Sequence, residues 1–242
     1  PFISDSNESI PKPNVEYVLS AINSILDFLK PNDLIIIEST CPVETTLNIS
    51  KIISDNIKFN VEEINIAYCP ERVIPGNVIY ELKNNDRVIG GINKKSAQAA
   101  RDFYATFCKG SIKLTNSVTA EMVKLTENSF RDVNIAFANE LSMICDKLDI
   151  NVRELIKLAN CHPRVNILNP SCGVGGHCIA VDPWFIVAKS PEITDLIKTA
   201  RVVNLNKTEW VLKKILEYSV EKETFLNRKP IIGIFGITYK PN

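Results

Sequence analysis

The first 115 residues alternate between segments with helical spacing of apolar positions and short, continuous apolar runs. From Val15 to Leu29 the apolar residues fall three and four positions apart, which predicts an amphipathic helix that ends at Pro31-Asn32. Two further helices are expected at 44–56 and 94–107. The apolar-rich runs predict a buried strand at 33–39 and further strands at 64–69, 86–92 and 111–115. This alternation predicts a parallel sheet with crossover helices.

The pattern becomes helical after residue 116. Residues 117–150 contain neither glycine nor proline and predict one long helix. A short helix is expected at 151–160, a glycine-rich loop follows, and a second long helix is expected from Glu192 to about Glu221. The apolar run 231–237 then predicts a strand that restarts an α/β pattern.

The domain organisation follows from these elements and from one missing motif. The sequence has no G-x-G-x-x-G, the fingerprint that opens a complete dinucleotide-binding domain. We therefore interpret residues 1–116 as the second half of a Rossmann-like α/β domain, 117–228 as a central all-helical domain, and 229–242 as the first strand of a further α/β domain. On this interpretation the chain is the core of a longer protein.

Composition narrows the class of protein. The 242 residues are 45% apolar, enough for a globular core, and the 28 basic residues balance the 28 acidic ones. A net charge of zero provides no field that favours nucleic acid or an acidic membrane. The sequence has no run of 18 apolar residues, and its first residues lack the basic start and apolar run of a signal peptide. We expect a cytoplasmic protein without nucleic-acid or membrane partners.

The seven cysteines are expected to be reduced, because none are spaced Cys-x-x-Cys and a chain of this size needs no disulfides. Four of them lie in or beside apolar segments, where a free cysteine usually acts as a small hydrophobic residue: Cys41, Cys69, Cys108 and Cys145.

The stretch NPSCGVGGHCIAVDPWF (169–185) carries the strongest chemical signal. Together with Cys161 and His162 it could offer zinc ligands, but the Cys-His pairs are adjacent and lack the spacing of a zinc knuckle. The glycines favour a different interpretation, in which a flexible backbone exposes Cys178 as a nucleophile, with His177 and Asp182 as its nearest titratable neighbours. A buried cysteine after a tight turn is the alternative.

A second candidate group lies on the predicted long helix. Lys124 and Asn128 are four residues apart, so they leave one face of the helix a single turn apart. A lysine and an amide in this arrangement could hold a water molecule or stabilise a developing alkoxide. A solvated helix face is the alternative.

Two more candidates follow predicted strands, where parallel sheets bind ligands. In ESTCPVETT (38–46) the hydroxyls of Ser39 and Thr40 could contact a ligand, although Thr40 could instead cap the next helix. In YCPERVIPG (68–76) the charged residues Glu71 and Arg72 lie at the tip, where an exposed charge pair is the alternative.

These four stretches, in this order, resemble the UDP-glucose/GDP-mannose dehydrogenase family over nearly the whole chain. The segment 162–185 is most similar to members that act on UDP-N-acetyl-D-mannosamine, because members acting on UDP-glucose usually carry GGxCLPKD there. The resemblance implies an NAD-dependent four-electron oxidation of the sugar C6 hydroxyl to a carboxylate, through a cysteine thiohemiacetal and a thioester. UDP-N-acetyl-glucosamine or UDP-glucose as substrate, a zinc-binding module, and an inactive dimerising core remain alternatives.

The resemblance also assigns roles to residues. Cys178 matches the family's nucleophile, and the residues that handle the oxyanion and the catalytic water match Lys124, Asn128 and Asp182. Positions near the cofactor match Ser39, Thr40 and Glu71. Positions near the substrate match Arg164, Asn169, Gly175 and Lys240.

Two positions depart from the pattern of UDP-glucose enzymes. Pro75 stands where those enzymes have a glutamate, which weakens a role for that turn, and Val181 stands where they have a lysine, which supports a different sugar. The family's helical middle usually forms a dimer interface, so the resemblance implies a homodimer through the central domain.

Overall fold

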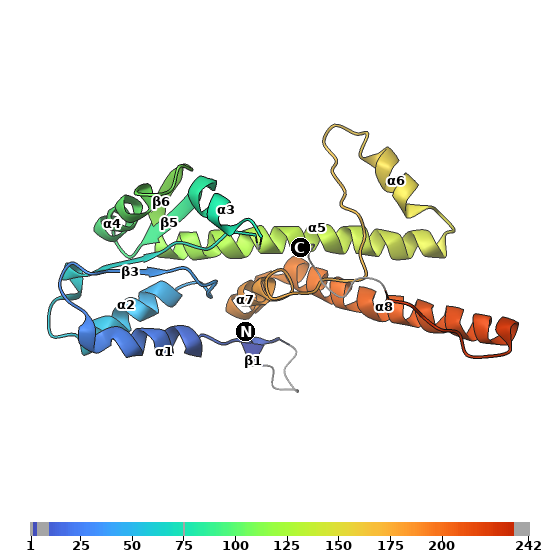
Figure 1. Ribbon diagram of the computed structural model, residues 1–242, viewed down its shortest axis with the longest axis horizontal. Coiled ribbons are helices and arrows are strands. Elements are labelled where there is room, and N and C mark those ends of the chain that lie inside the picture. Colours follow the sequence, from blue (N-terminus) through green and yellow to red (C-terminus); the bar gives the residue numbers. More distant parts are fainter. Residues whose placement is uncertain (1, 4–9, 75, 235–242) are drawn as a thin grey trace. The chain divides into compact units, whose positions relative to one another are not determined.

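The computed structural model describes residues 2–3, 10–74 and 76–234 (Figure 1). The chain divides into two compact units. The first comprises the chain up to Glu127 together with Trp184–Pro191, and the second comprises Asn128–Pro183 and the chain from Glu192 onward. None of the helices in the described ranges is long and apolar enough to cross a membrane.

The first unit is built on a four-stranded sheet of order β3-β4-β5-β6. Its strands are β3 (Leu34–Ile37), β4 (Asn65–Tyr68), β5 (Arg87–Gly91) and β6 (Ile112–Asn116). The pairs β3-β4 and β5-β6 are parallel, as expected, and their connections contain α2 (Thr45–Asn56) and α4 (Lys94–Ala105).

The central pair β4-β5 is antiparallel, so the prediction of an entirely parallel sheet is wrong there. An antiparallel partner starts at the edge where the previous strand ends, so the connection 69–86 does not have to cross the sheet. That connection contains α3 (Val78–Asn84), a helix that the apolar pattern did not predict. A separate short antiparallel pair joins β1 (Phe2–Ile3) and β2 (Lys12–Pro13).

Both faces of the sheet are covered, which explains the continuous apolar runs in its strands. Ile35, Ile37 and Ile66 belong to a core shared with α1 (Glu16–Ile25) and α2, whereas Ala67 and Ile89 belong to a second core with α4. Each fully buried isoleucine contributes about 1.5–3 kcal/mol through the hydrophobic effect. Cys41, Cys69 and Cys145 are buried and Cys108 is half-buried, as predicted for structural cysteines.

The start of α2 is held by a carboxylate from another helix rather than by Thr40. Glu121 is fully buried and accepts hydrogen bonds from the Glu44 amide (2.6 Å), the Thr46 amide (2.8 Å) and the Thr46 hydroxyl (2.6 Å). These bonds satisfy amides that a helix start leaves without partners. Burial nevertheless raises the pKa of the Glu121 carboxyl. The alternative in which Thr40 caps this helix is therefore wrong.

The helices of the sequence's second half are α5 (Ser117–Lys147), α6 (Val152–Ala159), α7 (Asp182–Lys189) and α8 (Asp195–Leu226). The sequence predicted α5, α6 and α8, although α8 extends further than expected. Single 3-10 turns lie at Leu26–Phe28, Val61–Glu63 and Pro191–Ile193. The predicted strand at 231–237 is not formed over 231–234, where no neighbouring strand is described and Ile231 is exposed; its other residues lie outside the described ranges.

Helix α7 was predicted as loop. Asp182 and Pro183 begin it, and proline is well suited to a first helical turn because it lacks the N–H that such a turn leaves without a partner. The next four residues, Trp184–Val187, are buried and belong to the first compact unit. The Asp-Pro pair before an apolar run was the available signal for this helix.

Candidate active site

The glycine-rich loop presents Cys178 to solvent. Gly173 and Gly176 have φ values of +138° and +84°, which only glycine adopts readily. A side chain added at Gly175 would meet no atom within 4 Å, so the space beside this backbone is open. Cys178 is exposed, and the prediction of an accessible thiol is confirmed; the alternative of a buried cysteine is wrong.

Asp182, four residues after Cys178, forms a hydrogen bond with Asn128 of α5. The Cys178 carbonyl accepts the amides of Val181 (3.0 Å) and Asp182 (2.9 Å), which forms the turn into α7. The Asn128 Nδ2 atom then donates to the Asp182 Oδ2 atom over 2.5 Å, and both side chains are buried. Asn128 therefore does not belong to a solvated face. Lys124, one turn earlier on α5, is half-buried.

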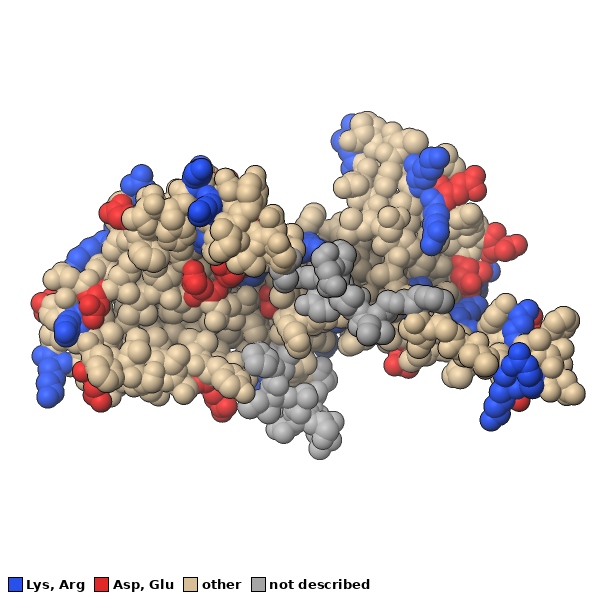
Figure 2. Space-filling model, in the orientation of Figure 1, with Lys and Arg blue, Asp and Glu red and all other residues tan. Residues whose placement is uncertain are grey.

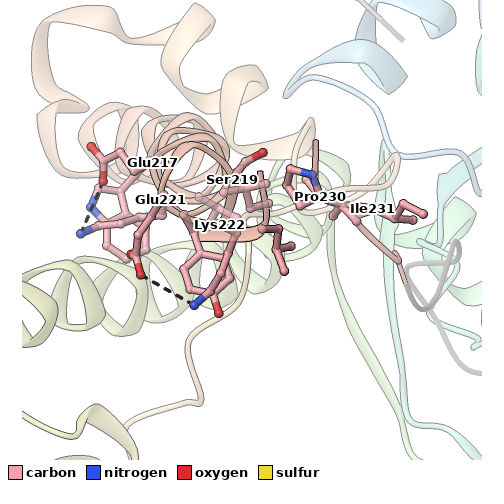
Figure 3. A pocket seen from close by; sticks show the side chains of 13 residues that line it. Glu217, Ser219, Glu221, Lys222, Pro230 and Ile231 are labelled. Carbon is pink, nitrogen blue, oxygen red and sulfur yellow. Dashed lines mark ion pairs between the residues drawn. The ribbon is translucent and has the colours of Figure 1, made fainter. Parts of the chain in front are cut away.

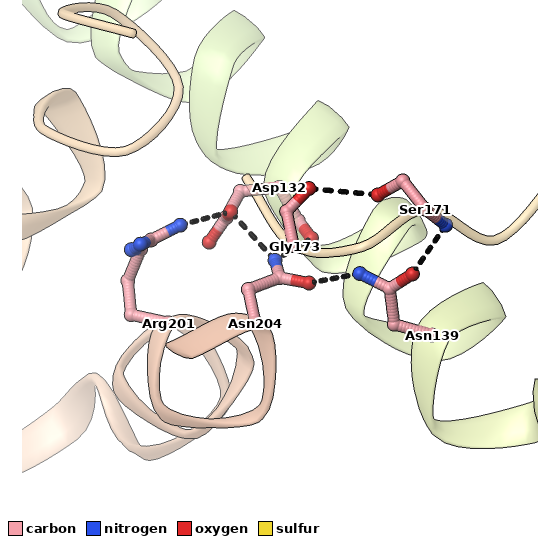
Figure 4. Close-up of polar contacts among 6 residues, drawn as sticks. All are labelled: Asp132, Asn139, Ser171, Gly173, Arg201 and Asn204. Atoms are coloured by element: carbon pink, nitrogen blue, oxygen red, sulfur yellow. Dashed lines mark hydrogen bonds and ion pairs between the residues drawn. The ribbon is translucent and has the colours of Figure 1, made fainter. Parts of the chain in front are cut away.

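The other end of the loop is held by a polar network that the sequence did not reveal (Figure 4). The Ser171 amide donates to Oδ1 of Asn139 on α5, over 2.7 Å. Asn139 in turn contacts Asn204 of α8, and Asn204 contacts Asp132, which forms an ion pair with Arg201. Apart from Ser171, all of these residues are buried.

The predicted cofactor positions lie at the carboxyl edge of β3 and β4. The Glu71 amide donates to the Glu38 carbonyl over 3.3 Å, which places the turn after β4 beside the end of β3. Ser39 is exposed and Thr40 is half-exposed there, so both hydroxyls remain available to a ligand. Parallel sheets bind ligands at such an edge.

The turn at Glu71 is not an exposed charge pair. The Glu71 Oε1 atom accepts the amides of Arg72 (2.5 Å) and Val73 (2.8 Å), so its carboxylate folds onto its own turn. Arg72 instead forms an ion pair with Glu127 over 2.5 Å. The charge-pair alternative is therefore wrong, and Pro75 of the same turn lies outside the described residues.

Among the predicted substrate positions, Arg164 and Asn169 are exposed and Lys240 lies outside the described residues. Asn169 lines a cavity of about 600 Å³ together with Arg153 and Lys207. Lys207 is buried, donates to the Ser142 hydroxyl over 2.8 Å, and has a pKa lowered by burial.

A larger cavity, of about 760 Å³, lies along the last turns of α8 and is lined by Glu217, Lys222 and Ile231, among others (Figure 3). It contains none of the predicted site residues.

Within the described ranges, no three His, Cys, Asp or Glu side chains are grouped as metal ligands, so the zinc hypothesis gains no support. On the face shown in Figure 2, basic and acidic side chains are interspersed.

Comparison with known protein families gives two matches that together cover most of the chain. Residues 2–108 match the NAD binding domain of the UDP-glucose/GDP-mannose dehydrogenase family. Residues 118–206 match the central domain of the same family.

Individual relatives agree with these matches. The chain is 52% identical, over its whole length, to 59% of a UDP-N-acetyl-D-mannosamine dehydrogenase from Campylobacter jejuni. It is 48% identical, again over its whole length, to 57% of an NDP-N-acetyl-D-galactosaminuronic acid dehydrogenase from Ralstonia solanacearum. Among solved structures, a UDP-D-ManNAc dehydrogenase from Pyrococcus horikoshii superposes with a TM-score of 0.83 at 41% identity, covering 90% of this chain and 52% of that one.

The chain thus spans between half and three fifths of the length of these proteins. The match to the family's NAD binding domain includes β3, β4 and β5 and the edge that carries Ser39 and Thr40, and the match to its central domain includes the cysteine loop. The sequence resemblance, the fold and both matches agree. The chain therefore belongs to the UDP-glucose/GDP-mannose dehydrogenase family.

Proposed function

We propose that the protein carrying this chain oxidises the C6 hydroxyl of UDP-N-acetyl-D-mannosamine to the carboxylate, with NAD as the oxidant. One observation carries this proposal: an exposed thiol, Cys178, ends a glycine-rich loop whose following turn leads into the buried Asn128–Asp182 pair. An accessible cysteine beside fixed polar groups suits covalent catalysis on a carbonyl. The names of the relatives from Campylobacter jejuni and Pyrococcus horikoshii support the choice of sugar.

The cofactor supplies hydride acceptance when bound, so that one alcohol, two NAD⁺ and one water yield one carboxylate, two NADH and three protons. The chain's own residues for this group are Ser39, Thr40 and Glu71, at the carboxyl edge of the sheet. Thr40 and Ser39 can donate hydroxyl hydrogen bonds to a ligand there. The folded-back Glu71 carboxylate stiffens the turn between β4 and α3.

Cys178 provides the covalent route for the second oxidation. Its sulfur forms a bond to the C6 aldehyde carbon, the carbonyl oxygen takes up a proton, and a thiohemiacetal results. Loss of hydride and a proton from this adduct leaves a thioester. Water then attacks the thioester carbon, the C–S bond breaks, and the thiol and the carboxylate are released.

Three polar residues, Asp182, Asn128 and Lys124, have supporting roles. Asp182 can accept a proton from the hydrolytic water, while Asn128 orients the Asp182 carboxylate through their 2.5 Å hydrogen bond. Lys124, one turn earlier on α5, carries the positive charge suited to a developing oxyanion. For Lys124 the proposal rests on the family resemblance.

The sugar is proposed on the loop sequence and on the relatives' names. Val181 precedes Asp182 where UDP-glucose enzymes have a lysine, which supports a sugar other than glucose. Arg164, Asn169 and Gly175 are proposed to contact the substrate, and the open space beside Gly175 leaves room for it. The Ralstonia relative makes an N-acetyl-D-galactosamine derivative a second candidate. A panel of UDP-sugars assayed with the complete protein decides between them.

The stoichiometry of NADH tests the reaction itself. With limiting UDP-N-acetyl-D-mannosamine, the complete protein should form two NADH per sugar, because the covalent adduct retains the aldehyde until it is oxidised again. Absorbance of NADH and mass spectrometry of the sugar product measure this ratio. One NADH per sugar with a released aldehyde contradicts the Cys178 step, and no NADH with any sugar of the panel contradicts the proposed function.

We also propose that the protein is a homodimer that covers an exposed apolar stripe on α5. Phe130, Phe137 and Ile144 are 68%, 53% and 49% exposed and are spaced seven residues apart, so they share one side of the helix. Asp132 and Asn139, two positions further along each time, face the buried polar network roughly opposite. A heptad-spaced stripe of this kind suits a helix of a second copy.

A charged substitution tests the dimer. The double substitution Phe130→Asp and Phe137→Asp should convert the dimer to a monomer, because each aspartate would be buried without a partner in the interface. Sedimentation velocity of the complete protein measures the change. Phe28→Asp is the control, since Phe28 is 75% exposed in the first compact unit and its replacement should leave the dimer intact. A monomeric unsubstituted protein contradicts the proposal.

A further inference from the structure

We infer that Asn139 and Asn204 are positioning residues for the Cys178 loop and that the Asp132–Arg201 pair sets their orientation. The inference rests on the proposed function, because it explains how the nucleophile's loop is held. It concerns residues that neither the sequence pattern nor the family resemblance singled out. All of the contacts involved lie within the second compact unit.

The network starts at a buried ion pair and ends at the loop backbone (Figure 4). Arg201 Nη1 donates to Asp132 Oδ1 over 2.6 Å, and Asn204 Nδ2 donates to the same oxygen over 2.8 Å. Asn139 Nδ2 donates to Asn204 Oδ1 over 2.8 Å. Asn139 Oδ1 finally accepts the Ser171 amide over 2.7 Å. The network therefore runs from the ion pair between α5 and α8 to Ser171, two residues before the first glycine of the loop.

The charge at Asp132 determines the direction of every bond in this series. A carboxylate only accepts hydrogen bonds, so Asn204 must turn its NH₂ group toward it. The Asn204 oxygen is then left to accept, which requires Asn139 to present its own NH₂ group. The Asn139 oxygen is thereby left facing the Ser171 amide, a donor. A flip of either amide would place two donors or two acceptors against each other in a buried site.

Additional contacts fix the loop over residues 171–173. The Ser171 hydroxyl donates to the Gly173 carbonyl over 2.7 Å, and the Thr208 hydroxyl of α8 donates to the Cys172 carbonyl over 3.1 Å. Gly173 itself has φ +138°, and a Cβ atom there would lie 2.1 Å from Thr208 Oγ1. The backbone at 171–173 is thus fixed against both long helices.

The loop is consequently held at both ends and open in the middle. Its far end is held by the amides of Val181 and Asp182 on the Cys178 carbonyl and by the Asn128–Asp182 bond. Between these ends the backbone at Gly175 has open space, and the side chain of Cys178, next to the far end, is exposed. The exposed thiol takes its position from the backbone that these contacts hold. Loss of the Asn139 contact should therefore displace a sulfur seven residues away.

The test compares Asn139→Ala with Ser142→Ala in the complete protein. Ser142 is a matched control, because it is a buried polar residue on α5 that bonds Lys207 and the Asn139 carbonyl but not the loop. Asn139→Ala should lower kcat by roughly 10- to 100-fold with a smaller change in KM, since misplacing a reacting group by about 1 Å costs that much. Ser142→Ala should retain kcat within about threefold.

Thiol alkylation provides a second measurement that needs no sugar. Iodoacetamide labelling resolved by peptide mass spectrometry compares Cys178 with Cys161, which is also exposed but lies outside the loop. Asn139→Ala and Thr208→Val should each change the Cys178 to Cys161 rate ratio by about threefold or more, because loop geometry controls thiol access. Thr208 is exposed on α8, so Thr208→Val tests the same inference even if Asn139→Ala does not fold.

The double variant Asn139→Ala with Asn204→Ala should show no larger effect on the ratio than Asn139→Ala, because both residues act through one series of bonds. An unchanged ratio in Asn139→Ala and Thr208→Val, or an equal change in Ser142→Ala, overturns the positioning role. If the ratio changes as expected while the unsubstituted protein oxidises no UDP-sugar, the positioning role stands and the proposed function fails.

Discussion

Cys178→Ser in the complete protein is expected to lower steady-state NADH formation by at least about 10³-fold while the protein stays folded. A serine hydroxyl is a far weaker nucleophile than a thiol, so the covalent second oxidation loses its route. Folding should change by less than about 0.5 kcal/mol, because the side chain is exposed and serine is close to cysteine in size.

Rapid mixing of the variant with NAD and sugar measures this effect. The first hydride transfer does not use the thiol, so at most a single turnover of NADH should appear before formation stops. Cys161→Ser and Cys172→Ser are controls, because both cysteines are exposed and neither is proposed to react. Full steady-state turnover of Cys178→Ser would show that this cysteine is structural.

The second large effect is expected on stability. Arg201→Met should lower the free energy of unfolding by about 3–5 kcal/mol, because it leaves the buried Asp132 carboxylate without its charge partner. The two side chains of this ion pair are only 2% and 1% exposed. Urea unfolding followed by circular dichroism in the far ultraviolet measures the change.

Two further variants make this result specific. Lys189→Met breaks an ion pair with Glu44 whose side chains are both 48% exposed, and it should cost no more than about 1 kcal/mol. Replacing both partners, with Asp132→Leu and Arg201→Met, should recover part of the loss, because no unpaired charge remains. A loss in Arg201→Met no greater than that in Lys189→Met contradicts the assigned importance of the buried pair.

The sequence predicted most elements of the fold because its signals are local. The predicted strands at 33–39 and 64–69 contain the apolar runs 34–37 and 66–69, and both become strands covered on both faces. The antiparallel pairing of β5 was not predictable, since strand direction depends on the path of the connection and not on the apolar pattern. Helix α7 was missed because its eight residues carry no amphipathic repeat of sufficient length.

The candidate site also has a part that the sequence predicts and a part that it does not. Three glycines before Cys178 are visible in the sequence, and the accessibility of the thiol follows from them. The contacts of Asn139 and Asn204 cannot be predicted from the sequence. Each polar residue on a helix resembles a solvated position until its partner 65 residues away is known. The spacings of seven between Asp132 and Asn139 and three between Arg201 and Asn204 were the only available hint.

Gly173 and Gly175 look equivalent in the sequence, but the structure gives them unequal reasons to be glycine. At Gly173 a larger residue would clash with Thr208 and would also have to adopt a positive φ. Replacement there therefore destabilises the folded loop. At Gly175 the surroundings are open and φ is not positive, so a larger residue fits in the protein without a bound ligand. Such a replacement lowers activity only if its side chain occupies the space in which the ligand binds. An equal loss of activity at the two positions would therefore have different causes. At Gly173 it would indicate a folding defect, and at Gly175 it would indicate an obstructed binding surface.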